Sequence, residues 1–147
     1  MKRIASIQDV SCLGRCSQTV ALPVVSAMGV ECAILPTAVL STHTSFPDFH
    51  WLDLTDQLLP VARHWKAQGV RFDALYTGYL ASDRQVAVVL ELLELLREEG
   101  TLLFVDPAMA DHGKLYAGFG PEFPALMAQV VSKAQITVPN LSLIHIS

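Results

Sequence analysis

Residues 102–116 read LLFVDPAMADHGKLY, and the interpretation of the whole chain starts from this stretch. Its first four residues are apolar, and a run of this length indicates a buried strand. Asp106 follows the strand directly, and Asp111 stands in the loop beyond it. Ligands of parallel α/β sheets bind at the carboxyl ends of the strands, and Mg²⁺ prefers oxygen ligands. The stretch therefore predicts a magnesium and phosphate site, with a polar turn that binds nothing as the alternative.

Strand-like and helix-like segments alternate on both sides of this stretch. We expect strands at 4–7, 32–35, 38–40, 72–76, 101–105 and 135–138, and helices at 19–28, 52–68, 82–99 and 121–134. Ser17 and Ser82 are candidate N-caps, while Pro23 and Pro60 predict late starts or bends in their helices. Such alternation is typical of an α/β fold, a Rossmann-like and mostly parallel sheet with helices on both faces.

Composition narrows the class of protein further. The 147 residues suffice for one domain with a core, and 52% of them are hydrophobic while 16% are charged. A net charge of -4 without a Lys/Arg cluster argues against a nucleic-acid partner. No uninterrupted apolar stretch is long enough to span a membrane, and no signal peptide precedes the first strand, so we expect a cytoplasmic protein. The spacing of Cys12, Cys16 and Cys32 fits no standard zinc motif, which favours reduced, packed thiols.

Four segments then carry a resemblance to a known family. They are Ser6-Ile7-Gln8-Asp9 with Gly14-Arg15-Cys16-Ser17, the run 35–44 (LPTAVLSTHT), Tyr76-Thr77-Gly78-Tyr79-Leu80, and 106–116 with Val138-Pro139-Asn140. In this order and spacing they resemble the pyridoxal and pyridoxamine kinases, vitamin B6 salvage enzymes of the ribokinase-like superfamily. The resemblance implies ATP-dependent phosphorylation of the 5′-hydroxymethyl of pyridoxal, pyridoxamine or pyridoxine, with ATP and Mg²⁺ as cofactors.

The same resemblance implies a role for individual residues. Asp9, His43, Thr44 and Tyr79 would bind the B6 ring, with Asp9 hydrogen-bonded to it. Asp106, Asp111, Tyr116 and Asn140 would bind the nucleotide, and Asp106 and Asp111 would also hold the metal. These roles suit the chemistry, because a flat ring needs an apolar wall with a few fixed polar groups. Phosphoryl transfer needs positioning and charge neutralisation.

The sequence also departs from the family pattern. Ala110 replaces a usual glycine, Val138 replaces a usual threonine, and residues 143–147 fit no family motif. The catalytic aspartate of the family lies in a late Gly-Thr-Gly-Asp turn, and no such turn occurs in these 147 residues. We therefore interpret residues 1–142 as the N-terminal part of one kinase domain and 143–147 as an atypical tail. We expect this chain alone to be inactive and the full-length protein to be a homodimer.

Two other functions stay open. A hydroxymethylpyrimidine kinase of thiamine synthesis would share the fold, but those enzymes usually carry a Gly-rich G-S-D-x-x-G-G-A-G stretch in the first loop. Here the corresponding residues 8–14 read QDVSCLG. A non-catalytic, nucleotide-binding fragment is the third possibility.

Overall fold

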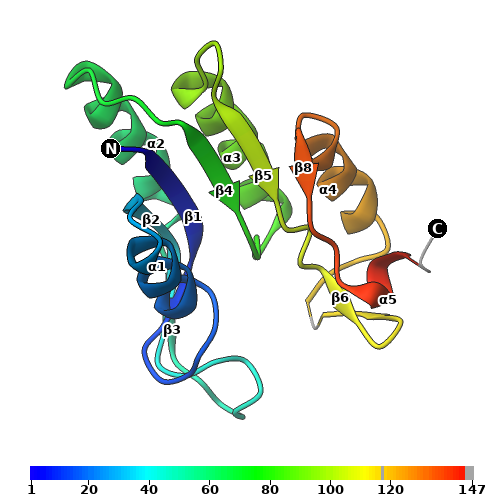
Figure 1. Cartoon of the computed structure of the whole chain (residues 1–147). Coiled ribbons are helices and arrows are strands. Elements are labelled where there is room, and N and C mark those ends of the chain that lie inside the picture. The colour runs from blue at the N-terminus through cyan, green and yellow to red at the C-terminus, as the bar shows by residue number, and fades with distance from the viewer. Residues whose placement is uncertain (117, 145–147) are drawn as a thin grey trace.

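The strands form one six-stranded sheet whose order brings distant segments together (Figure 1). A computed structural model describes residues 1–116 and 118–144. Its main sheet has the order β3-β2-β1-β4-β5-β8, and β3 alone is antiparallel to its neighbour. The strands are β1 (Arg3–Ser11), β2 (Glu31–Leu40), β3 (Trp51–Asp53), β4 (Ala74–Thr77), β5 (Leu102–Val105) and β8 (Ile136–Thr137).

Helices lie on both faces of this sheet, as the sequence predicts. They are α1 (Gln18–Ala27), α2 (Thr55–Ala67), α3 (Asp83–Leu96), α4 (Phe123–Val131) and α5 (Leu141–Ile144). Figure 1 shows α1 on the near face, against β1 and β2, and α2, α3 and α4 on the far face. Alternate strand residues such as Ile7, Leu35, Leu75 and Leu103 point to the far face and are fully or almost fully buried there. The main core therefore lies between the sheet and α2, α3 and α4.

The prediction of two strands at 32–35 and 38–40 is wrong, because both belong to the single strand β2. Pro36 and Thr37 lie between them, where the pairing of β1 with β2 shifts register. Gln8 pairs with Pro36 but Val10 pairs with Val39, so β2 holds one residue more than β1. Proline cannot donate to a ladder and is tolerated in sheets at such bulges.

The second predicted helix begins later than its apolar pattern indicates. Residues Trp51–Asp53 form β3 instead, antiparallel to Ala38–Leu40. Asp53 then accepts hydrogen bonds from both the backbone N–H and the hydroxyl of Thr55, which starts α2. Pro60 does not delay this start, and α1 likewise runs through Pro23.

The loop after β5 contains a small hairpin that the sequence analysis did not predict. Strands β6 (Ala110–Asp111) and β7 (Lys114–Leu115) pair across a two-residue turn. His112 and Gly113 form this turn, and both have positive φ, 48° and 73°. Two positive φ angles in succession are typical of the type I′ turn, in which Asn-Gly is the strong sequence signal. Histidine before Gly113 gives a weaker signal.

The predicted tail at 143–147 is only partly described. Leu143 and Ile144 end the short helix α5, and residues 145–147 lie outside the described residues. Among the helices that the structure describes, none has the length and apolarity to cross a membrane.

Candidate functional site

A cavity of about 700 Å³ opens at the carboxyl ends of the strands. It gathers five of the eight predicted site residues, which come from β1 and from the loops after β2, β4 and β5. These are Asp9, His43, Thr44, Tyr79 and Tyr116. All four residues that the sequence analysis assigned to a ring pocket thus line one cavity. We refer to it as the ring cavity.

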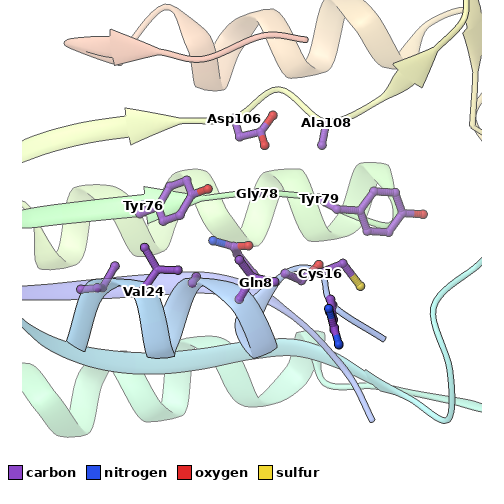
Figure 2. Close-up of a pocket in the computed structure, with 13 residues that line it drawn as sticks. Gln8, Cys16, Val24, Tyr76, Gly78, Tyr79, Asp106 and Ala108 are labelled. Atoms are coloured by element: carbon purple, nitrogen blue, oxygen red, sulfur yellow. The ribbon is translucent and has the colours of Figure 1, made fainter. Parts of the chain in front are cut away.

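A second cavity, of about 380 Å³, adjoins the ring cavity and contains Asp106. The two cavities share Arg15, Cys16, Ser17, Tyr79 and Ala108 in their walls. Figure 2 shows Gln8 on β1, Tyr76 on β4 and Asp106 just after β5 at this second cavity, which we call the Asp106 cavity. Gln8 approaches Gly78 so closely that a Cβ there would lie 3.0 Å from its side chain. Glycine at this position therefore gives the buried Gln8 side chain its room.

Asp9 is held at the ring cavity by two hydroxyl groups. The hydroxyl of Ser17 donates to Oδ1 at 2.6 Å, and that of Ser11 donates to Oδ2 at 3.4 Å. The Asp9 side chain is buried, with the whole residue 6% exposed. Burial raises the pKa of Tyr79, and the negative charge of Asp9 raises it further. Asp9 and Tyr79 are therefore close enough to interact electrostatically across the cavity.

His43 sits against the first loop because Gly14 leaves room for it. A Cβ at Gly14, whose φ is 142°, would lie 2.8 Å from Cδ2 of the His43 ring. The His43 N–H donates to the carbonyl of Leu13 at 3.0 Å, and its ring packs edge-on against Phe46. The loop after β1 and the loop after β2 are thereby joined at the cavity wall.

Asp106 and Asp111 lie in different surroundings. Asp106 is half-buried at the end of β5, and burial raises its pKa. Asp111 is about half exposed on β6, and its Oδ1 accepts from the backbone N–H of His112 at 2.8 Å. Burial, then Asp111, then Asp106 raise the pKa of Tyr116, so both carboxylates act on the same ring. The structure thus brings the two acids to one end of the sheet.

The metal role of these acids stays a prediction. Within residues 1–116 and 118–144, no group of three or more His, Cys, Asp or Glu side chains is placed to hold a metal ion. Cys12, Cys16 and Cys32 are free thiols, but the prediction that they are packed is wrong, because Cys12 is exposed and the other two are only partly buried. Mg²⁺ is usually bound by one or two carboxylates together with water and substrate phosphates. Two aspartates, one of them desolvated, fit that donor set, whereas a protein-only cage is not present in the described residues.

Asn140 makes contacts of a structural kind. Its Nδ2 donates to the carbonyl of Ala110 on β6 at 2.9 Å, and its Oδ1 accepts from the N–H of Leu143 at 3.1 Å. The side chain thus connects the hairpin to the start of α5. It lines neither of the two cavities.

The chain and its fold are similar to known proteins. No family model matches the chain. A crystal structure from Bacteroides thetaiotaomicron VPI-5482, named as a phosphomethylpyrimidine kinase and crystallised with pyridoxal, is 43% identical. It superposes with a TM-score of 0.91 over 96% of this chain and 49% of its own. Pyridoxal kinase from Lactobacillus plantarum is 35% identical, with a TM-score of 0.88 over 97% of this chain and 51% of its own. Over most of its length the chain is thus similar to pyridoxal and phosphomethylpyrimidine kinases, consistent with a fragment of a ribokinase-like B6 kinase.

A curated relative agrees with these structures. The pyridoxine/pyridoxal/pyridoxamine kinase of Bordetella avium is 30% identical over 121 residues, which cover 75% of this chain and 40% of the relative. The chain therefore spans about half the length of the kinases that it matches, or somewhat less. The predicted resemblance to these kinases and the predicted fold are confirmed.

The structure also shows residues in and behind the cavity wall that sequence reasoning missed. Ser17, predicted as a helix cap, makes no capping bond and contacts Asp9 instead. Phe119 packs against the two tyrosines from the core side, with its ring centroid 5.6 Å from Tyr79 and 6.4 Å from Tyr116, and lines neither cavity. Serine before a helix is ambiguous in sequence, and no spacing rule joins Phe119 to Tyr79. Only the short apolar cluster around Phe119 could have drawn attention to it.

Proposed function

We propose that this chain is part of an ATP-dependent kinase that phosphorylates the 5′-hydroxymethyl group of a B6 vitamer. The observation that supports the proposal is the ring cavity, in which Asp9, His43, Thr44 and Tyr79 converge next to the cavity that holds Asp106. A ring bound in the first cavity would present a substituent toward the second. This is the arrangement that transfer from a nucleotide to a small hydroxymethyl ring requires.

The walls suit a flat aromatic ring with polar substituents. Tyr79 and Tyr116 line the ring cavity and provide aromatic surface, which stacks on or abuts such a ring. Asp9, fixed by two hydroxyl groups, provides a hydrogen-bond acceptor for a ring N–H. A few fixed polar groups in an otherwise apolar cavity give a small ligand its orientation.

The Asp106 cavity suits the nucleotide end of the reaction. Bound Mg-ATP would supply the phosphoryl group, and its Mg²⁺ would neutralise part of the negative charge of the phosphates. Asp106 and Asp111 are the carboxylates that would hold the metal, and Tyr116 and Asn140 would lie beside the nucleotide. Of these four only Asp106 lines this cavity, while Tyr116 lines the ring cavity and Asp111 and Asn140 line neither. The expected Gly-Thr-Gly-Asp turn does not occur in the 147 residues. We therefore propose that this chain binds ligands without turning them over.

Calorimetry on the 147-residue chain tests the proposal. We expect pyridoxal and pyridoxamine to bind and Mg-ADP to bind more tightly than ADP in the presence of a chelator. We expect no ATP-dependent formation of phosphorylated vitamer, measured by chromatography. A chain that binds neither vitamer would contradict the substrate assignment, and measurable phosphorylation would contradict the expected inactivity.

Hydroxymethylpyrimidine is the second candidate substrate. The Bacteroides structure named as a phosphomethylpyrimidine kinase is 43% identical to this chain, which favours it, although that protein was crystallised with pyridoxal. The first loop lacks the Gly-rich stretch usual in the pyrimidine enzymes, which favours a B6 vitamer. Competition between pyridoxal and hydroxymethylpyrimidine for the chain distinguishes the two, because the true substrate class will displace the other.

A further inference from the structure

We infer that Ser17 is a positioning residue, whose hydroxyl orients Asp9 toward an N–H donor on the ring of the bound substrate. This inference rests on the proposed function, because it concerns the ligand of the ring cavity. It adds a residue outside the predicted set and assigns its effect to affinity for rings that carry such a donor. Three features of the structure support it.

The first feature is the backbone of Ser17. Its φ is 48° and its ψ is -129°, a backbone conformation that residues other than glycine rarely adopt. Such a conformation is unfavourable and persists only where the surroundings hold it. Ser17 also stands at the N-cap of α1, yet its hydroxyl caps no helix N–H. Capping of the helix therefore does not explain why serine occupies this position.

The second feature is the bond that the hydroxyl does make. It donates to Asp9 Oδ1 at 2.6 Å, a short hydrogen bond of the charge-assisted kind. The two residues come from consecutive elements, β1 and the start of α1. Both line the ring cavity, and Ser17 lies also on the wall shared with the Asp106 cavity. The bond therefore fixes the carboxylate at the side from which a ligand would approach.

The third feature is the strand that carries Asp9. The register shift between β1 and β2 spans Gln8 to Val10, so Asp9 lies opposite the extra residue of β2. Bulges of this kind re-aim side chains and are frequent beside active sites. Ser11, two residues further on, donates to the other carboxylate oxygen. The position of Asp9 is therefore set by three features together: the register shift, the bond from Ser17 and the bond from Ser11.

A carboxylate held in this way can only accept hydrogen bonds. It therefore selects rings with an N–H at the matching edge, such as a protonated pyridine or an aminopyrimidine. Loss of the Ser17 hydroxyl would leave Asp9 held only by the longer bond from Ser11 and would leave Oδ1 without its partner. We expect affinity for such rings to fall about tenfold, the typical effect of losing one hydrogen bond to a charged group.

Two substitutions separate this role from a structural one. Ser17→Gly and Ser17→Ala both remove the hydroxyl, but only glycine tolerates the positive φ. The alanine variant will therefore melt at a lower temperature than the glycine variant. Calorimetry with pyridoxal and pyridoxamine should show the same loss of affinity, about tenfold, in both. If affinity instead follows melting temperature, so that the glycine variant binds like wild type, the inference is wrong.

A double-mutant cycle with Asp9→Asn tests whether Ser17 acts through Asp9. If it does, Ser17→Gly will weaken binding of the wild-type chain but have little further effect beside Asp9→Asn. Additive losses would show that Ser17 contacts the ligand directly, against the inference. A benzene analogue of pyridoxal, with carbon in place of the ring nitrogen, should bind wild type and Ser17→Gly equally. A wild-type chain that binds no vitamer and no hydroxymethylpyrimidine would overturn the proposed function itself. Equal affinity of wild type, Ser17→Gly and Ser17→Ala for the vitamers would overturn this inference alone.

Discussion

At two places beside the cavities, a side chain packs so closely against the backbone that only glycine leaves enough room. Gly14 has its Cβ position 2.8 Å from the His43 ring, and Gly78 has its own 3.0 Å from Gln8. Other glycines with positive φ, such as Gly29, have nothing within 4 Å of that position. The site therefore depends on glycine for space, whereas the helix ends depend on it for conformation.

The first prediction uses this difference. Gly14→Ala would push the His43 ring out of the cavity wall, and we expect affinity for pyridoxal to fall at least tenfold together with a loss of stability of about 1–2 kcal/mol. Gly29→Ala is the matched control, because it adds the same methyl group at a positive φ in open space. It should lower stability by a similar amount and leave affinity unchanged. Equal affinity of both variants would show that Gly14 is not needed to seat His43.

Asp106 gives a second prediction at the scale of one residue. Its pKa is raised above the ordinary value of 3.8 by burial. The folded state therefore favours the protonated form, and the stability that this adds is complete below pH 3.8 and lost as the pH rises through the folded pKa. Asp106→Asn removes the titration. In buffer without divalent cations, the variant should gain melting temperature over wild type as the pH rises from acid to neutral. A constant difference across that range would contradict the burial of the carboxylate.

At the scale of elements, the buried side chain of Gln85 joins three of them. From α3, its Nε2 donates to the carbonyl of Thr37 in β2 at 3.2 Å and to the hydroxyl of Thr55 in α2 at 3.0 Å. Its Oε1 accepts from the N–H of Ala81 at 2.8 Å. Because the residue is only 1% exposed, water cannot replace these bonds. Gln85 thus fixes α2 and α3 against β2, the strand that precedes the loop with His43.

The third prediction follows from these bonds. Gln85→Met keeps the volume but leaves buried polar groups unpaired, which costs about 2 kcal/mol in free energy of unfolding. Gln57→Met on the exposed side of α2 is the control and should change stability by less than about 0.5 kcal/mol. Urea denaturation measures both. Similar midpoints for the two variants would mean that the Gln85 bonds add nothing to the packing of α2 and α3.

Local patterns predicted most elements, and they failed where pairing over a distance decides the structure. Helix α3 was expected because Ser82 caps it, and the Ser82 hydroxyl does accept from the N–H of Gln85. Strand β3 was missed because Trp51–Asp53 has no strand pattern of its own and exists by pairing with β2. The same limit applies to the site. Motifs named Asp9, His43 and Tyr79, but only folding shows that Ser17 turns toward Asp9.

At the scale of the whole molecule, the near face of the sheet is only partly covered. Figure 1 shows α1 over β1 and β2, with no described helix over β4, β5 and β8 on that side. In this region Tyr76 pairs with Phe104 and Phe104 with Ile136, so the three lie in one row across the strands. Leu102, Ile136 and Val138 are 47%, 42% and 41% exposed. A row of apolar side chains open to water is a site of association rather than an ordinary surface.

The last prediction concerns this face. We expect the 147-residue chain to bind a hydrophobic dye and to self-associate in sedimentation experiments, because burying these side chains removes apolar area from water. Leu102→Lys together with Ile136→Lys should reduce both dye binding and average mass, because two charges cannot be buried unpaired. Leu52→Lys is the control, since Leu52 is 58% exposed on β3 at the opposite edge of the sheet. The control should associate like wild type. A wild-type chain that stays monomeric and binds no dye would show that the exposed row is too small to drive association, and association unchanged by the double substitution would place the contact elsewhere.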